Sequence, residues 1–320
     1  MTFAGSPDRV EAHLVPDAGY EFDPFRISGF PREASLALLR SLALAGRAPR
    51  ACREILARRQ PDVVLGGGGY VAGPMVLAAW TRKIPAALTE ADSHLGLANR
   101  MAAPFARRVF LSFPIPGRTP PKFVVTGRPV PVRARVASRE EARRLFELPQ
   151  DGPVLLVFGG SQGARSLNEL VVDRLGAEGP AVLHLAGERD FEELRGRVSR
   201  PDYRLVPFTH DFGAALGAAD LALCRAGGSV YELAAAGKPA VLVPYPFATA
   251  DHQAKNARYF EEAGAAVVVP DAEVARVPDL VLELLRDPVR LASMSAAMLS
   301  VARPDAADEI AEGLIALARR

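Results

Sequence analysis

Short runs of β-branched and apolar residues alternate along the chain with longer stretches rich in alanine, leucine, arginine and glutamate. Parallel strands need such helix-length connections, because a tight hairpin cannot join them. The strand-like runs are almost wholly apolar, as expected where helices cover both faces of a sheet. The runs lie at 63–65, 109–113, 122–126, 154–158, 181–185, 221–224, 240–244 and 265–270. The sequence therefore predicts an α/β fold built from βαβ units.

A proline-rich break divides the chain of 320 residues, which is long enough for two sheets. Residues 114–133 contain six prolines, which interrupt any helix. After the break, Ser138 stands three residues before Glu141, a spacing that predicts a helix capping box. We therefore expect an N-terminal domain at 1–132 and a C-terminal domain at 133–320. From Asp287 onward we expect one or two amphipathic helices, the last of them packing back on the N-terminal domain.

Composition excludes several classes of protein. Hydrophobic residues make up 49% and charged residues 24%, which is unlike a disordered chain. A net charge of +2 is too small for a strong nucleic-acid footprint. Two cysteines do not make a disulfide framework and favour a reduced, cytosolic compartment. No apolar run reaches the ~18 residues of a membrane span, and no signal peptide is visible at the start.

Residues 32–60 mix leucine and alanine with seven arginines. One interpretation is a pair of surface helices packed by their leucines. The other is an interfacial patch, with an apolar face in the lipid and arginines on anionic headgroups. The residues alone leave both interpretations open.

Three glycine-rich turns each follow a strand-like run and precede a helix. The first holds four consecutive glycines, Gly66–Gly69, followed by Tyr70 and Gly73. Four glycines exceed what a tight turn needs, and they let a ligand approach the backbone closely. The second turn runs through Gly159, Gly160, Ser161, Gln162 and Gly163. It is neither a Walker A loop nor a GxGxxG fingerprint, but a glycine loop that opens a helix favours phosphate.

The third turn contains Arg225, Gly227, Gly228 and Ser229, with Glu232 one helical turn further on. A carboxylate at that position can accept hydrogen bonds from the two vicinal hydroxyls of a ribose, although it would also suit the positive end of the helix. Asp251, His252, Gln253 and Asn256 then bring polar groups into one loop and helix start, as recognition of a sugar requires. The second half of the chain thus predicts a nucleotide-diphosphate-sugar site beyond the carboxyl ends of its strands.

With these motifs in view, the chain resembles the MurG family, transferases that add N-acetylglucosamine (GlcNAc) from UDP-GlcNAc to lipid I. The resemblance runs over essentially the whole chain. The matching stretches are PDVVLGGGGYVAGP (61–74), TEADSHLGLANR (89–100), VVTGRPV (124–130), VFGGSQGARSLNE (157–169), CRAGGSVYELAAAGKPAVLVPYP (224–246) and DHQAKNA (251–257).

The resemblance implies the GT-B fold, two Rossmann-like domains facing across a cleft, and an inverting hexosyltransferase of peptidoglycan synthesis that needs no cofactor and no metal. It implies UDP-GlcNAc and lipid I as partners, no nucleic acid, and peripheral contact with the cytoplasmic face of the cell membrane. It also implies roles for individual residues. The donor-binding set is Gly160, Ser161, Gln162, Gly163, Thr209, Arg225, Gly227, Gly228, Ser229, Glu232, His252 and Gln253, and the acceptor-side set is Gly68, Gly69, Tyr70 and Gly73.

The chain departs from the family pattern in places. Asp92 stands where the family usually has asparagine. An arginine usually follows the turn at 127–129; here that position is Pro131, with Arg128 and Arg133 nearby. The family opens with a strand, a GGTGGH-type loop that carries a histidine proposed as general base, and a helix. This sequence begins at what resembles the family's second strand, so we expect an incomplete N-terminal domain with a gap in its sheet, and a start site further upstream.

Without that loop, the predicted catalytic residues are Glu90, Asp92 and His94, one of which would take the proton of the acceptor hydroxyl. His184, inside an apolar run, is expected to be structural. Two alternatives stay open: another GT-B glycosyltransferase with a lipid or natural-product acceptor, and a non-catalytic protein that binds UDP-sugars. A nucleotide-sugar epimerase fits less well, because it lacks a lipid-facing domain.

Overall fold

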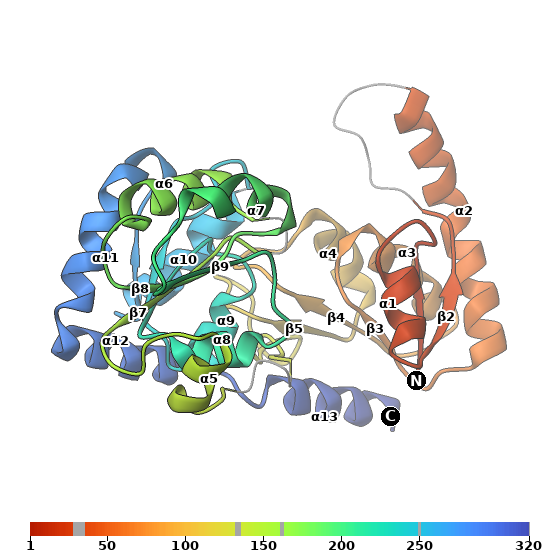
Figure 1. The fold of residues 1–320 in the computed structure, drawn as a ribbon. Coiled ribbons are helices and arrows are strands. Elements are labelled where there is room, and N and C mark those ends of the chain that lie inside the picture. Colours follow the sequence, from red (N-terminus) through yellow and green to blue (C-terminus); the bar gives the residue numbers. More distant parts are fainter. Residues whose placement is uncertain (28–35, 132–135, 161–162, 249–250, 320) are drawn as a thin grey trace. The chain divides into compact units, whose positions relative to one another are not determined.

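The computed structural model describes residues 1–27, 36–131, 136–160, 163–248 and 251–319, with backbone alone for 36–46. It divides into two compact units, each described separately below (Figure 1). The N-terminal unit comprises Met1–Thr126 together with Asp308–Arg320, and the C-terminal unit comprises Gly127–Ala307. The division therefore falls between Thr126 and Gly127, and the end of the chain returns to the first unit.

The described strands of the N-terminal unit form two parallel sheets. The smaller sheet pairs β1 (Thr2–Gly5) with β2 (Glu21–Pro24). The larger contains, in spatial order, β3 (Val64–Gly66), β4 (Ala86–Glu90), β5 (Arg108–Leu111) and β6 (Phe123–Val125). Strand order follows chain order in the larger sheet, so the carboxyl ends of β3 and β4 lie side by side. That edge carries the first glycine turn.

The helices of this unit are α1 (Glu11–Asp17), α2 (Leu36–Arg59), α3 (Gly69–Thr81), α4 (Leu97–Ala102) and α13 (Ala306–Ala318). The prediction of a helix pair within 32–60 is wrong, because α2 is one continuous helix that contains Pro49. Its second half packs against the core through Ala48, Cys52, Ile55 and Leu56. Burial of this apolar face holds the helix together despite the hydrogen bond that proline cannot donate.

The C-terminal unit contains one parallel sheet of six strands. Its spatial order is β12 (Ala266–Val268), β11 (Ala240–Leu242), β10 (Leu221–Cys224), β7 (Val154–Phe158), β8 (Ala181–Leu185) and β9 (Tyr203–Val206). Alternate residues of the strands face opposite sides. Leu155 and Val157, for example, join the core cluster that contains Leu167 and Val171 of α6 (Arg165–Leu175). The chain order reverses direction at β7 and β10, which makes this edge a topological switch point.

Helices cover both faces of this sheet; α6 and α7 (Glu188–Leu194) lie on one side, and α8 (Phe212–Ala218) lies on the other (Figure 1). The remaining helices are α5 (Arg139–Leu145), α9 (Val230–Ala235), α10 (His252–Glu262), α11 (Val277–Leu285) and α12 (Pro288–Val301). Half of the predicted capping box forms at the start of α5, since the Ser138 hydroxyl accepts a hydrogen bond from the Glu141 amide. The Glu141 carboxylate accepts a hydrogen bond from that hydroxyl. The stretch from Asp287 forms two helices, α12 and α13.

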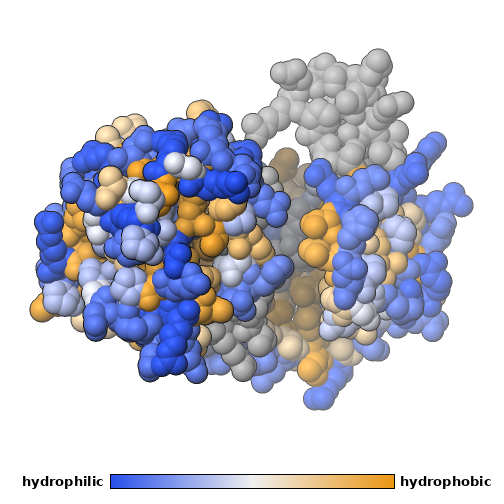
Figure 2. Space-filling view, viewed as in Figure 1, coloured by the Kyte–Doolittle hydropathy of each residue, from blue (hydrophilic) through white to orange (hydrophobic). Residues whose placement is uncertain are grey.

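Hydrophilic residues cover most of the viewed surface of each unit, with hydrophobic patches between them (Figure 2). In the described part of the chain, no helix is both long enough and apolar enough to cross a membrane.

Candidate functional site

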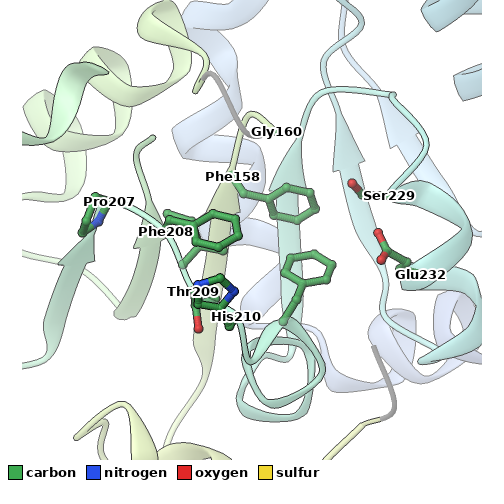
Figure 3. A pocket seen from close by; sticks show the side chains of 10 residues that line it. Phe158, Gly160, Pro207, Phe208, Thr209, His210, Ser229 and Glu232 are labelled. Atoms are coloured by element: carbon green, nitrogen blue, oxygen red, sulfur yellow. The ribbon is translucent and has the colours of Figure 1, made fainter. Parts of the chain in front are cut away.

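A pocket of about 190 Å³ opens at the carboxyl ends of β7, β8 and β9 in the C-terminal unit (Figure 3). Four side chains on one part of its wall, Pro207 to His210, come from the loop after β9. Ser229 and Glu232 of the third glycine turn lie on the opposite part (Figure 3). The pocket thus lies where open parallel sheets bind their ligands.

Aromatic rings make up much of the pocket wall. Phe208 and His210 meet edge to face with ring centroids 5.0 Å apart, and Phe158 meets Phe212 in the same way at 5.2 Å. Phe208 is 50% exposed, so its ring is available to a ligand. The hydroxyl of Thr209 accepts a hydrogen bond from the amide of Asp211 at 3.0 Å, which fixes the turn into α8. A flat apolar wall facing a carboxylate suits a nucleoside, whose base stacks while its ribose hydroxyls donate to the carboxylate.

The second glycine turn connects β7 to α6. At Gly163, where φ is +72°, a side chain would be strained, and an added Cβ would lie 2.3 Å from the carbonyl oxygen of Ala186. The close approach brings the start of α6 against the end of β8. Backbone amides at the amino end of a helix of this length favour an anion. Gly160 lines the pocket, whereas the predicted residues Ser161 and Gln162 lie outside the described residues.

A buried network of polar side chains holds the carbonyl of Ala186, against which the second glycine turn packs. The side-chain amide nitrogen of Asn168 donates to the carbonyl of Ala186 at 2.7 Å and to the carboxylate of Asp190 at 2.9 Å. Its oxygen must then face Nε2 of His184, 3.0 Å away, so Nε2 carries the ring proton. Nδ1 consequently accepts a hydrogen bond from the hydroxyl of Tyr203 at 2.8 Å. Burial lowers the pKa of His184 to about 3, and the ring stays neutral.

Arg225 of the third turn is buried and engaged with the protein. Its guanidinium forms an ion pair with Asp271 at 2.5 Å and donates to the hydroxyl of Ser166 at 2.8 Å. It also donates to the carbonyls of Val243 and Pro244, each at 3.2 Å. These contacts join the ends of β10 and β11 to the first turn of α6. They favour a structural role for Arg225, while Gly227 and Gly228 beside it are half-buried.

In the polar segment at the start of α10, one side chain is hydrogen-bonded to the preceding loop. The side-chain oxygen of Gln253 accepts a hydrogen bond from the amide of Tyr245 at 2.9 Å. The amide nitrogen of Gln253 is a donor at the other end of the same group. His252 begins α10 and is half-buried, and Asp251 before it has a left-handed backbone with φ of +57°.

In the N-terminal unit, the first glycine turn lies beside the end of β4, the strand that leads into the predicted catalytic loop. An added Cβ on Gly68 would lie 3.7 Å from the carbonyl oxygen of Thr89, next to Glu90. Gly69 and Tyr70 begin α3, with Gly73 one turn further on. The hydroxyl of Tyr70 accepts a hydrogen bond from Nε of Arg9 at 3.0 Å.

Glu90 is buried and holds the loop that follows β4. Its carboxylate accepts hydrogen bonds from the amide of Asp92 at 3.2 Å, the amide of Gly96 at 2.9 Å and the side chain of Asn99 at 2.8 Å. A carboxylate with this many internal donors is suited to ordering a loop. Asp92 and His94 are half-buried on that loop. Nδ1 of His94 is buried and has no hydrogen-bond partner among the described residues.

In the described ranges, no group of histidine, cysteine, aspartate and glutamate side chains is arranged to hold a metal ion.

Comparison with known proteins identifies the family. A model of the glycosyltransferase family 28 N-terminal domain matches residues 2–111, and the model of the C-terminal domain of that family matches residues 154–310. A curated protein of Salinibacter ruber is 42% identical over 330 residues, covering 100% of this chain and 89% of that protein. It is named UDP-N-acetylglucosamine--N-acetylmuramyl-(pentapeptide) pyrophosphoryl-undecaprenol N-acetylglucosamine transferase. The chain belongs to the MurG family.

Further similarities agree with membership of the MurG family. A Halothermothrix orenii protein of the same name is 36% identical, covering 95% of this chain and 87% of that protein. The crystal structure of Acinetobacter baumannii MurG has a TM-score of 0.78 and 26% identity, with 98% of this chain and 90% of that chain covered. The predicted α/β class and GT-B fold are confirmed, as is the predicted hexosyltransferase class.

Most of the pocket wall in this MurG-family chain was not predicted from the sequence. The sequence predicted Gly160, Thr209, Ser229 and Glu232, but not the aromatic residues around them. A signal was present, because Phe158 ends a predicted strand and Phe208, His210 and Phe212 flank Thr209. Residues just beyond the carboxyl ends of parallel strands form the binding edge, whatever their type.

Proposed function

We propose that this protein transfers GlcNAc from UDP-GlcNAc to the 4-hydroxyl of N-acetylmuramic acid in undecaprenyl-pyrophosphoryl-MurNAc-pentapeptide, converting lipid I to lipid II. The observation that carries the proposal is similarity over the whole chain to curated transferases named for this reaction, at up to 42% identity. The pocket in the C-terminal unit supports the same conclusion from its chemistry. Aromatic walls, a carboxylate and an adjoining glycine loop are the groups that a nucleoside diphosphate needs.

The donor would bind the C-terminal unit. Its base would stack on the ring of Phe208 beside Thr209, and the ribose hydroxyls would donate to Glu232. The diphosphate would lie at the turn through Gly160 and Gly163, where the amides of α6 begin. His252 and Gln253 would contact the hydroxyls of the sugar.

The reaction is a single in-line displacement. The acceptor oxygen forms a bond to the anomeric carbon of GlcNAc, the bond from that carbon to the phosphate oxygen breaks, and UDP leaves with the electron pair. One displacement inverts the anomeric configuration. Negative charge grows on the β-phosphate, and fixed dipoles at the start of α6 stabilise that charge without having to reorganise.

The acceptor would contact the N-terminal unit at Gly68, Gly69, Tyr70 and Gly73. The acceptor hydroxyl must lose its proton to a base. We favour His94 for this role because imidazole is the commonest general base in enzymes, whereas the carboxylate of Glu90 already accepts three hydrogen bonds.

An assay of UDP release tests the proposal. The purified chain, UDP-GlcNAc and a soluble lipid I analogue should together release UDP at a rate that depends on both substrates. Glu232→Gln should raise the KM for UDP-GlcNAc about tenfold or more, because a ribose diol loses a charged acceptor. Glu192→Gln, on the exposed surface of α7, is the matched control and should leave KM unchanged.

Release of UDP with a different acceptor, but not with the lipid I analogue, would contradict the proposal and favour another GT-B glycosyltransferase. Binding of UDP-GlcNAc with no turnover on any acceptor would instead favour a UDP-sugar-binding protein.

We further propose peripheral membrane contact through an apolar surface of α3 and α4. Leu97 and Met101 lie one turn apart on α4 and are 67% and 66% exposed. Trp80 at the end of α3 is 55% exposed and contacts Phe105, with ring centroids 5.2 Å apart. Exposed Arg82 and Lys83 follow Trp80, and Arg100 lies on α4. An apolar surface flanked by cations suits an anionic lipid surface.

Sedimentation with lipid vesicles tests this contact. The protein should bind vesicles that contain phosphatidylglycerol more tightly than vesicles of phosphatidylcholine alone, and the double variant Leu97→Glu/Met101→Glu should lose that binding. Leu145→Glu, at an exposed leucine of α5, is the matched control. Equal vesicle binding by the double variant and the parent would contradict membrane contact at this surface.

A further inference from the structure

Arg128 lies directly against the third glycine turn of the same unit. A Cβ built on Gly228 would lie 2.5 Å from Cζ of Arg128, 2.6 Å from Nη1 and 2.7 Å from Nη2. Nearly equal distances to three atoms of a planar group mean that the face of the guanidinium covers the Cα of Gly228. Any side chain at Gly228 would displace the guanidinium. Face-on packing leaves the N–H groups around the edge of the plane directed away from the glycine.

The backbone before Arg128 is fixed by a second close approach. Gly127 has φ of +83°, and an added Cβ there would lie 2.3 Å from Cβ of Arg303. The turn at 127–128 therefore packs against residue 303 on one side and against the 227–228 turn on the other. Arg128 is half-buried in this position. Its guanidinium is thus held by the fold and is not a freely moving surface charge.

The charge of Arg128 has no counter-charge in the described parts of the chain, where no carboxylate lies within ion-pair distance of it and no hydrogen bond from it is found. Arg225, in the neighbouring strand end, is by contrast neutralised by Asp271. A half-buried and unpaired guanidinium costs desolvation energy, which a bound anion would offset. The turn that it covers leads directly into Ser229 and Glu232 of the pocket wall.

We propose that Arg128 is a donor-binding residue whose guanidinium holds the diphosphate of the nucleotide sugar; this rests on the proposed function. The planar fork of arginine matches the geometry of two phosphate oxygens, and the donor supplies the negative charge that Arg128 lacks. The contact also stabilises the UDP that leaves, because its charge stays neutralised after the glycosidic bond to phosphate breaks.

Titration with UDP and with uridine tests the proposal, since only UDP carries the diphosphate. Arg128→Gln should raise the Kd for UDP about 10- to 100-fold, the usual effect of losing a charged hydrogen-bonding partner, and change the Kd for uridine less than about twofold. Arg128→Lys should bind UDP with intermediate affinity, because lysine keeps the charge but lacks the fork. Arg174→Gln, at an exposed arginine of α6, is the matched control and should bind both ligands like the parent.

Thermal unfolding of each variant separates binding from folding. An equal loss of affinity for UDP and uridine in Arg128→Gln would show that Arg128 only supports the turn, and would overturn the proposal. Unchanged UDP affinity would overturn it as well, while leaving the proposed transfer reaction intact. Failure of the parent protein to bind either UDP or UDP-GlcNAc would overturn the proposed function itself.

Discussion

Single buried polar residues govern how the donor-side loops are held. The neutral ring of His184 connects Tyr203 on β9 to Asn168 on α6, and Asn168 in turn fixes the carbonyl that Gly163 touches. Every member of this chain of contacts is a hydrogen-bonding group removed from water. Such a network is stabilising only while each group keeps its partner.

Acid should therefore destabilise the C-terminal unit through His184. Its folded-state pKa of about 3 lies below the ordinary value of 6.5, so the unfolded chain binds the proton more readily than the folded one. The stability that the neutral ring of His184 contributes is complete above pH 6.5 and is lost as the pH falls toward 3. The free energy of unfolding should decrease by up to about 1.4 kcal/mol for each pH unit in that window.

Urea unfolding followed by circular dichroism between pH 7.5 and 4.5 measures this slope. His184→Gln should be less stable at pH 7.5 but should show a shallower dependence on pH. His210→Gln, at an exposed histidine of the same unit, should keep the slope of the parent. A parent and a His184→Gln variant with parallel pH dependence would contradict the account.

The residue that takes the proton should be separable from the residue that orders its loop. His94→Gln should lower kcat about 10²- to 10⁴-fold with little change in the KM for UDP-GlcNAc, because a general base contributes about this much. Glu90→Gln should chiefly lower stability, since its carboxylate binds two amides and Asn99. Steady-state kinetics across pH provides the measurement. If His94→Gln keeps full kcat and Asp92→Asn loses it, Asp92 is the base.

At the scale of elements, the last helix of the chain belongs to the core of the first unit. Ile310 and Leu317 of α13 pack with Ala87 of β4 and Phe110 of β5. An added Cβ on Gly313 would lie 2.7 Å from the ring of Phe110, so the helix approaches the strand closely. The N-terminal unit is therefore completed by residues nearly two hundred positions away in the sequence.

Truncation of this contact should destabilise the N-terminal unit. Ile310→Ala should cost about 2–4 kcal/mol, as expected for a buried isoleucine, whereas Ile315→Ala, at a residue 50% exposed, should cost less than about 1 kcal/mol. Trp80 is the only tryptophan and lies in this unit, so its fluorescence reports unfolding there. Equal effects of the two substitutions would show that α13 does not stabilise the unit.

Burial explains which elements could be predicted from the sequence. The strands of the C-terminal sheet that are continuous apolar runs, such as β7 and β11, were recognisable from their residues alone. β4 (AALTE) and β9 (YRLV) were missed, because alanine, glutamate and arginine weaken the strand pattern. They are strands because neighbouring strands supply their hydrogen bonds, which is tertiary information.

The candidate site also contains features that the sequence reveals and contacts that depend on the fold. Glycine-rich turns can be recognised in a sequence, because few other residues adopt the backbone conformations of tight turns. The engagement of Arg225 with Asp271 joins positions far apart along the chain and depends on the fold. The covering of Gly228 by Arg128 depends on it in the same way.

In the molecule as a whole, the proposed function divides the chemistry between the two units. The C-terminal unit carries the pocket with Glu232, and the N-terminal unit carries the first glycine turn beside Thr89 and Asn99. Neither set of residues could perform a transfer alone, because the donor needs a binding pocket and the acceptor needs a base. Under the proposed function, one chain therefore joins GlcNAc to a muramyl acceptor with inversion.

The structure of the product tests this proposed function. The protein should be incubated with UDP-GlcNAc, whose anomeric bond is α, and a soluble lipid I analogue, and the product examined by mass spectrometry and NMR. We predict one added GlcNAc, joined by a β bond to the 4-oxygen of the muramyl sugar. An α bond, a different point of attachment or no added sugar would contradict the account.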